Sequence, residues 1–243
     1  MKGIELFAGI GGIALAAERA GIETVAFCER DLFCQKVLKK HWPDVPIFDD
    51  IRVLDRQVLE KRGVNIEAIE LISGGFPCQP YSIAGKRRGQ KDDRDLWSEM
   101  FRVISEVRPT WVVGENVANF VNMGLDNTLS DLESIGYTCQ SFIIPACAVG
   151  ARHRRDRTFI VAHADSKYVE GSKQKEIQRK PGLQRFPHYG SVKEWSERST
   201  VHQPKLLRSF NGIPDQVDRI RSLGNAVVPQ QIYPIFKAIM EVS

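Results

Sequence analysis

Short apolar runs alternate with amphipathic stretches over the first 160 residues of the chain. The apolar runs are rich in β-branched residues and predict strands at residues 3–7, 24–27, 69–73 and 111–114. The stretches between them carry apolar residues at helical spacing and predict helices at residues 13–20, 32–41, 96–107 and 127–135. This alternation is typical of βαβ units, so we expect an α/β fold built on a mostly parallel sheet.

Two later apolar runs, at residues 137–145 and 157–162, have no convincing helix between them. We therefore expect them to extend the sheet in the antiparallel sense. The pattern returns near the end of the chain, where residues 214–223 and 232–240 predict two more helices.

Between these parts, the segment from His163 to Arg208 is rich in Lys, Gln, Ser, Gly and Pro and carries only isolated aromatic residues. Such a composition indicates a loop-rich insertion. We divide the chain into a main domain over residues 1–162, a loop-rich region over 163–213, and a C-terminal segment over 214–243 that returns to the main domain.

Composition fits one sizeable soluble domain, because the 243 residues are 42% hydrophobic and 26% charged. No apolar stretch approaches the roughly 18 to 20 residues of a membrane span, and the first residues do not resemble a signal peptide, so we expect a cytoplasmic protein. The five cysteines form no CxxC pair, which argues against a disulfide framework and against a zinc site. We expect four of them to be buried structural thiols: Cys28, Cys34, Cys139 and Cys147.

The formal net charge of +4 is unevenly distributed. The segment from His163 to Arg208 holds ten Lys and Arg residues against five Asp and Glu residues, and the remainder of the chain is close to neutral. A local positive excess of this kind indicates a polyanionic partner.

A glycine-rich turn follows the first predicted strand, where Gly9, Gly11 and Ala14 satisfy the pattern G-x-G-x-x-[GA]. Glu29 ends the next strand, where an acid could hold a ribose hydroxyl. Asp50 and Ile51 fall where a third strand should end, and could contact an adenine amino group and ring. Taken alone, these residues fit a nucleoside cofactor such as NAD, but also a tight strand-to-helix turn and a solvated acid.

The loop that begins at Ser73 places Cys78 between two prolines and after two glycines, at the end of a predicted strand. A cysteine presented on a stiff loop is a candidate nucleophile, and a thiolate benefits from nearby positive charge. That charge comes from the next sixteen residues, which include Lys86, Arg87, Arg88, Lys91 and Arg94. The same cations could instead hold a phosphate backbone.

Glu115 lies at the end of another apolar strand, within Glu115-Asn116-Val117. Because the carboxyl ends of parallel strands face one crevice, we expect Glu115, Cys78 and the glycine loop to converge there. A carboxyl group in an apolar setting can stay protonated and act as an acid near neutral pH. The alternative is a strand-end Glu that caps a helix.

Together these motifs resemble the DNA (cytosine-5) methyltransferases, nearly from end to end. The segment Phe7 to Gly12 resembles the S-adenosylmethionine motif of that family, Gly75-Phe76-Pro77-Cys78-Gln79 its nucleophile loop, and Glu115-Asn116-Val117 its acid motif. His153-Arg154-Arg155-Asp156-Arg157 is similar to its Q-x-R-x-R motif, and Gly224 to Pro229 to its closing cofactor motif. The resemblance implies a Rossmann-like methyltransferase fold with a small loop-rich recognition region.

The resemblance also assigns roles residue by residue. The catalytic residues it implies are Cys78, Glu115, Arg155 and Arg157. The residues it implies for S-adenosylmethionine are Phe7, Ala8, Gly9, Ile10, Gly11, Gly12, Glu29, Arg30, Asp50, Ile51, Gly75, Pro77, Leu96, Asn225, Ala226 and Val227. The residues it implies for DNA are Gln79, Ser82, Lys86, Arg87, Arg88 and His153.

Three features depart from the family pattern. His153 replaces the usual Gln, Arg30 stands where many members have an aromatic residue, and the recognition region spans only about 65 residues. The last departure predicts low sequence specificity.

The reaction that the resemblance implies transfers a methyl group to C5 of a flipped cytosine through a covalent Cys78 adduct. The expected partner is double-stranded DNA, with a cognate restriction endonuclease as a functional partner, and the expected protein is monomeric and prokaryotic or phage-encoded. Three alternatives remain open: an NAD-dependent oxidoreductase, a tRNA methyltransferase, and a DNA-binding protein that has lost catalysis.

Overall fold

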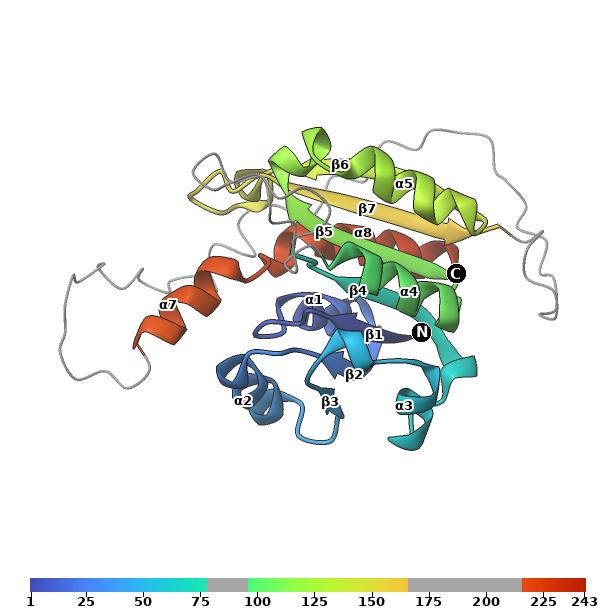
Figure 1. The fold of residues 1–243 in the computed structure, drawn as a ribbon. Coiled ribbons are helices and arrows are strands. Elements are labelled where there is room, and N and C mark those ends of the chain that lie inside the picture. Colours follow the sequence, from blue (N-terminus) through green and yellow to red (C-terminus); the bar gives the residue numbers. More distant parts are fainter. Residues whose placement is uncertain (78–95, 166–215) are drawn as a thin grey trace, which may run out of the picture.

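The computed structural model describes residues 1–77, 96–165 and 216–243. Within these residues, one sheet of seven strands in the order β3-β2-β1-β4-β5-β7-β6 forms the centre of the molecule, and helices cover both of its faces (Figure 1). The strands are β1 (Lys2–Leu6), β2 (Glu23–Cys28), β3 (Ile47–Phe48), β4 (Ile69–Gly74), β5 (Trp111–Val117), β6 (Tyr137–Ile144) and β7 (Arg157–Ala164).

The direction of the strands confirms the fold predicted from the sequence. Strands β1 to β5 pair in the parallel sense, and β7 pairs antiparallel with both β5 and β6. Because β7 runs backwards, it begins at the sheet edge where the parallel strands end. The residues just before β7 therefore lie beside the loops that follow β4 and β5.

The helices also follow the predicted alternation. They are α1 (Gly12–Ala20), α2 (Leu32–His41), α3 (Arg56–Lys61), α4 (Trp97–Val107), α5 (Leu125–Ser134), α7 (Gln216–Asn225) and α8 (Pro229–Val242). Short 3-10 turns are η1 (Ile51–Val53), η2 (Ile66–Ala68), η4 (Ala118–Asn122) and η5 (Ala146–Val149). The sequence pattern missed α3, which is only six residues long and has one buried residue, Leu59. Helix α8 starts earlier than predicted because Pro229 occupies its first turn, where a missing N–H costs nothing.

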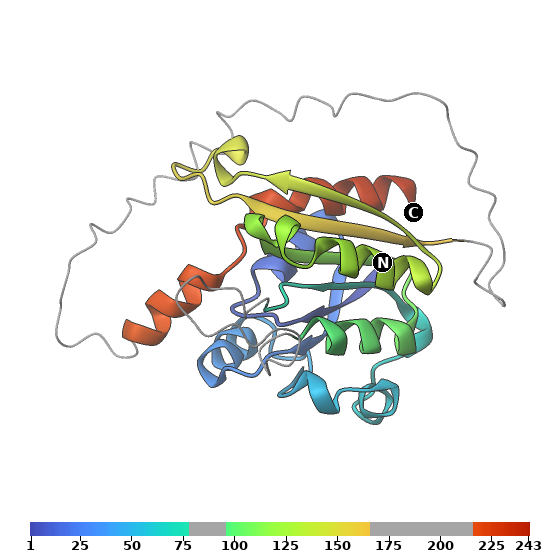
Figure 2. The same ribbon diagram turned by 45° about the horizontal axis from the view of Figure 1, so that its top comes forward.

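Two separate hydrophobic clusters hold the sheet between its helices. Neighbouring strand residues point to opposite faces, so Ile72 packs with α4 and α5 while Leu71 packs with α1 and α8. Figure 2 shows α8 and α5 on opposite sides of the sheet. On the α8 side, Ile232 and Phe236 are fully buried. The C-terminal segment is therefore part of the main core and packs against the first helix of the chain.

In the described parts of the chain, no helix has both the length and the apolar character that crossing a membrane requires. The loop-rich region predicted for residues 163–213 lies outside the described residues from residue 166 onward. Its separation from the main domain stays a prediction.

Replacing Phe236 with Ala should lower the free energy of unfolding by about 3 to 5 kcal/mol, because the change opens a cavity where α8 meets the sheet. Chemical denaturation followed by circular dichroism measures the change. Lys237, the next residue on the exposed side of α8, is the matched control, and its replacement with Ala should change stability little. Similar losses for the two variants would contradict the packing of α8 described above.

Candidate active site

A cavity of about 620 Å³ lies at the carboxyl ends of β1, β2, β4 and β5. It brings together most of the residues singled out in the sequence. These are Phe7, Ala8, Gly9, Gly12, Glu29, Arg30, Asp50, Ile51, Gly75, Pro77, Leu96, Glu115, Arg157, Asn225, Ala226 and Val227. The glycine loop and Glu115 thus border one crevice, as the parallel topology requires.

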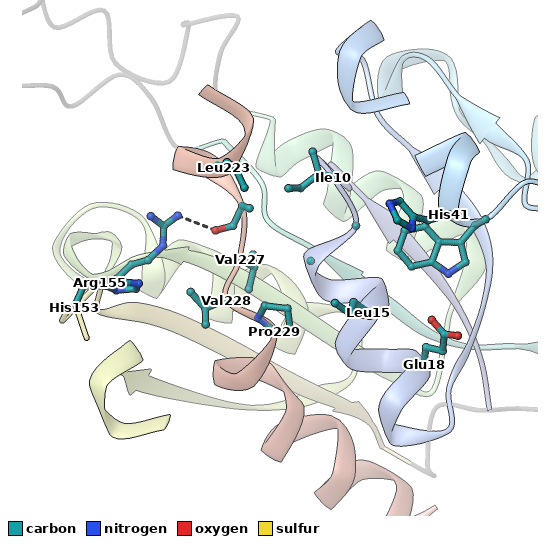
Figure 3. Close-up of a pocket in the computed structure, with 14 residues that line it drawn as sticks. Ile10, Leu15, Glu18, His41, His153, Arg155, Leu223, Val227, Val228 and Pro229 are labelled. Atoms are coloured by element: carbon teal, nitrogen blue, oxygen red, sulfur yellow. Dashed lines mark hydrogen bonds between the residues drawn. The ribbon is translucent and has the colours of Figure 1, made fainter. Parts of the chain in front are cut away.

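Four of the proposed site residues lie elsewhere. Ile10, Gly11, His153 and Arg155 line a second cavity of about 600 Å³ on the other side of the glycine loop (Figure 3). The loop turns sharply there, because Gly9 and Gly11 both have left-handed φ values, of 54° and 82°.

Six of the proposed site residues fall in the gap between residues 77 and 96 and lie outside the described residues. They are Cys78, Gln79, Ser82, Lys86, Arg87 and Arg88.

Glu29 fixes the shape of the glycine loop. Its carboxylate accepts a hydrogen bond from the backbone N–H of Gly9 at 2.7 Å and another from the backbone N–H of Asp31 at 2.7 Å. One side chain at the end of β2 therefore ties the loop after β1 to the loop before α2. The carboxylate also lines the cavity, as a ribose contact requires.

Asp50 is engaged by its own neighbour. Its carboxylate accepts hydrogen bonds from the side chain of Arg52, at 2.6 Å for Nη2, and from the Arg52 backbone N–H at 3.1 Å. These bonds lower the pKa of Asp50 to about 2, so the group is ionised at neutral pH. An adenine amino group would have to share the carboxylate with Arg52.

Glu115 is a buried acid with a specific partner. Its Oε1 lies 2.8 Å from Nε of Arg157, and its side chain is only 10% exposed. Burial raises the pKa of Glu115 from 4.5 to about 6, and the nearby charges of Arg157 and Arg155 limit that rise. The antiparallel register brings this partner close to Glu115. Arg157 of β7 pairs directly with Val117 of β5, and Glu115 lies two residues before Val117 on the same face of the strand.

Gly75 leaves room for this acid, since a Cβ there would lie 2.9 Å from Oε2 of Glu115. Any larger residue at position 75 would displace the carboxyl group from Arg157. The described end of the cysteine loop therefore approaches the acid closely through its backbone.

An aromatic cluster anchors the chain on both sides of the cysteine loop. Phe76 is buried and packs against Trp97 and Phe120, with ring centroids 5.0 and 5.3 Å apart. Asn116 donates a hydrogen bond from its side-chain amide to the backbone carbonyl of Phe76 at 3.0 Å. The residue after Glu115 thus positions the backbone two residues before Cys78.

The cysteines correct one expectation. Cys28 and Cys34 are buried, and Cys139 is partly buried, but Cys147 is exposed. Cys147 lies in η5, a single turn at the edge of the sheet in which only Ala146 packs inward. Cys28 and Cys34 border the cavity, and burial raises the pKa of Cys28 to about 12, so its thiol is not a ready nucleophile.

Glu5 is a cavity residue that the sequence analysis missed. It lies in β1 with a side chain that is almost fully buried, and within the described part of the chain neither carboxyl oxygen has a well-formed hydrogen bond. Burial raises its pKa well above the usual value, the charge of Glu29 adds to the rise, and the nearby backbone N–H groups of Ile13 and Ala14 only partly offset it. An acid at an inward position of an apolar strand was the signal that could have revealed it.

A comparison with known families decides the identity. The model of the C-5 cytosine-specific DNA methylase family matches residues 1–209 of the chain. The chain belongs to this family. Curated relatives include the Type II methyltransferase M.AquIA of Picosynechococcus sp., which is 34% identical over 177 residues covering 67% of this chain and 71% of the relative. M.HhaI of Haemophilus parahaemolyticus is 30% identical over 166 residues, covering 66% of this chain and 48% of the relative.

Solved structures of methyltransferases share the fold. A DNA modification methyltransferase encoded within an E. coli prophage has a TM-score of 0.58 at 24% identity, covering 73% of this chain and 50% of its own. A mutant of DNMT2 from Spodoptera frugiperda has a TM-score of 0.57 at 26% identity, covering 74% and 55%. The chain spans about half the length of these proteins and of several of its curated relatives.

The lining of this cavity fits S-adenosylmethionine, the methyl donor that the family implies. S-adenosylmethionine carries a sulfonium and an ammonium group, and the cavity contains the buried carboxyl of Glu5, whose oxygens have no well-formed hydrogen bond to the described residues. A cation bound there would stabilise the ionised form of a carboxyl group that burial disfavours. Glu29 and Asp50 offer acceptors for hydroxyl and amino groups, and the glycine loop allows a nucleoside to approach the backbone.

Replacing Glu5 with Gln should stabilise the ligand-free protein at pH 8 and have little effect near pH 4. The folded protein has a raised Glu5 pKa, so the unfolded chain loses this proton more readily and wild-type stability falls as the pH rises above about 4.5. Thermal melting of both proteins across this range tests the sign. A difference in melting temperature between the two proteins that is the same at all pH values would contradict the raised pKa.

The Glu5→Gln variant should also bind S-adenosylmethionine at least about tenfold more weakly, because it loses an acceptor for positive charge.

Replacing Arg157 with Met should raise the pKa of Glu115 above 6, because the change removes a cation that favours the ionised form. The carboxyl ¹³C resonance of Glu115, assigned with a Glu115→Gln variant, reports the titration. Arg157→Lys is the matched control and should keep the pKa close to that of the wild type. A pKa that stays near 6 in the Met variant would rule out Arg157 as the group that limits the rise.

Proposed function

We propose that this protein is a DNA (cytosine-5) methyltransferase that transfers a methyl group from S-adenosylmethionine to C5 of a cytosine flipped out of double-stranded DNA. The observation that carries the proposal is the state of Glu115. It is a buried acid with a pKa of about 6, paired with Arg157, in the same cavity as the glycine loop and Pro77. Pro77 directly precedes Cys78 in the sequence.

Cytosine C5 is a poor nucleophile, so the ring must first be activated. In the proposed mechanism the Cys78 thiolate forms a bond to C6, and the electron pair of the C5–C6 double bond shifts toward N3. Glu115 donates its proton to N3 and neutralises the charge that develops there. A carboxyl group with a pKa near 6 retains enough protonated form at neutral pH for this role.

S-adenosylmethionine, when bound, supplies an electrophilic methyl group for the activated C5. Loss of the C5 proton to a base then re-forms the C5–C6 double bond and expels the Cys78 thiolate, while the N3 proton returns to Glu115. Glu5, Glu29 and Asp50 would hold the donor, and Arg157 would keep Glu115 oriented through both steps.

A stacked cytosine is inaccessible to these groups, so the base must leave the duplex at a cost of a few kcal/mol. We assign the contacts that compensate for this cost to the flipped base and the neighbouring phosphates. The proposed DNA-binding residues are Gln79, Ser82, Lys86, Arg87, Arg88 and His153. Because only about 65 residues separate Arg157 from Leu223, where the family carries its recognition region, we also propose a reduced target-recognition region with limited sequence specificity.

The curated relatives named above are Type II methyltransferases, a class that acts with restriction endonucleases. We accordingly propose a cognate endonuclease as a functional partner, and action as a monomer in the cytoplasm of a prokaryotic or phage-infected cell.

The covalent mechanism is tested with DNA that carries 5-fluorocytosine, whose C5 substituent cannot be removed as a proton. Wild-type protein incubated with this DNA and S-adenosylmethionine should form an adduct that survives denaturing electrophoresis. Cys78→Ser should form none, and Glu115→Gln should form it at least about a hundredfold more slowly, the usual scale for a positioned general acid.

Absence of the wild-type adduct, or its presence in the Ser variant, would overturn the mechanism. Independently of the trapping experiment, bisulfite sequencing of plasmid DNA from cells that express the protein identifies the methylated cytosines. A thermal-shift comparison of S-adenosylmethionine with NAD separates the proposed function from an oxidoreductase that uses the same glycine loop.

A further inference from the structure

Two cavities of this protein share one thin wall. Gly12, Ala226 and Val227 border both the cavity of about 620 Å³ that we assign to the methyl donor and the second cavity of about 600 Å³. The wall is tightly closed, because a Cβ on Gly12 would lie 2.6 Å from the backbone oxygen of Val227. The position of residues 224–227 therefore sets the shape of the donor cavity on this side.

Arg155 holds this wall from the second cavity (Figure 3). Its Nη2 donates hydrogen bonds to the backbone carbonyls of Gly224 at 2.6 Å and Ala226 at 2.7 Å. The two acceptors flank Asn225, which lines the donor cavity. A single guanidinium nitrogen thus fixes the peptide groups on both sides of a proposed donor-binding residue.

The backbone of Arg155 is itself held firmly. Its φ is +35°, a conformation that residues other than glycine rarely adopt and that the surroundings must enforce. Its carbonyl accepts a hydrogen bond at 3.0 Å from the side-chain amide of Gln231, which also donates to the carbonyl of Ile144 at 2.6 Å. Gln231 is fully buried in α8, so Arg155 is anchored to the core.

The family pattern implies a catalytic role for Arg155, and the structure shows its guanidinium in contact with the wall. Its Nε is buried and has no hydrogen-bond partner among residues 1–77, 96–165 and 216–243, and its Nη2 is occupied by the two carbonyls. Arg157, two residues later, points to the other cavity and pairs with Glu115. The short segment between these arginines therefore connects the wall of the donor site with the acid.

We propose that Arg155 is a positioning residue for the methyl donor, which holds residues 224–227 against the glycine loop. This inference rests on the proposed function, because it takes the larger cavity as the donor site. On this proposal, Arg155 raises the affinity for the methyl donor, and Arg157 keeps Glu115 in place.

The test is isothermal titration calorimetry of S-adenosylmethionine and S-adenosylhomocysteine without DNA. Arg155→Ala should weaken the affinity for both ligands by at least about tenfold, since two charge-assisted hydrogen bonds to the wall are lost. Arg155→Lys should keep most of the affinity, because an ammonium group can still donate to the carbonyls.

Steady-state kinetics provide a second readout. In Arg155→Ala, the KM for S-adenosylmethionine should rise with the loss of affinity, while kcat at saturating donor and the KM for DNA stay within about threefold of the wild type. Arg154→Ala is the matched control, because Arg154 is exposed on the same loop and pairs only with Asp156 among the ion pairs of the described residues. It should retain the wild-type affinity for the donor.

Three outcomes would overturn the inference. They are a raised KM for DNA with unchanged donor affinity, which would make Arg155 a DNA contact; an equal loss in Arg154→Ala; and no rescue by Lys. If Arg155→Ala fails to fold, Arg155→Gln takes its place. The affinity for the donor should then be highest in the wild type, lower in Arg155→Lys and lowest in Arg155→Gln. Any other order would also overturn the inference. A wild-type protein that binds neither ligand would instead refute the assignment of the cavity and hence the proposed function.

Discussion

The close approach of Gly12 to the Val227 carbonyl joins the two ends of the chain. No side chain fits between them, since a Cβ at position 12 would lie 2.6 Å from that oxygen. The contact leads the C-terminal segment across the glycine loop and delivers α8 to the face of the sheet that α1 also covers. Residues from both ends of the chain line the cavity of about 620 Å³, so this contact helps to shape the site. The same contact therefore belongs both to the site and to the packing of the core.

Two buried carboxyl groups in this cavity are held in different states. Glu115 has a guanidinium partner and a pKa of about 6, whereas Glu5 has no ion pair among the described residues and burial raises its pKa well above the usual value. Different environments of this kind allow two chemically similar acids to serve different tasks. Glu115 can exchange a proton with a substrate near neutral pH, and Glu5 can respond to a positive charge in the cavity.

The sequence predicted the features that depend on local pattern or on simple topology. The apolar runs gave the strands, and the rule that parallel strands end at one crevice placed Glu115 beside the glycine loop. It did not predict the partner of Glu115, because that pair depends on the antiparallel register of β5 and β7. Nor did it predict the acceptors of Arg155, which lie about 70 residues away in the chain. Nor did it predict that the Glu5 carboxyl oxygens have no well-formed hydrogen bond to the described residues, because this depends on the surroundings of the side chain in the fold and not on its neighbours in sequence.

The buried Glu5 carboxyl links the folding stability of the protein to the binding of its ligand. Without a bound cation, the burial of this acid is only partly offset by nearby backbone N–H groups, and this lowers the stability of the ligand-free fold when the acid is ionised. A ligand that binds only the folded state increases the free energy of unfolding, and the increase grows with the logarithm of the ratio of ligand concentration to dissociation constant. The supply of the methyl donor would therefore govern how long each molecule resists unfolding and proteolysis, in addition to how fast it works.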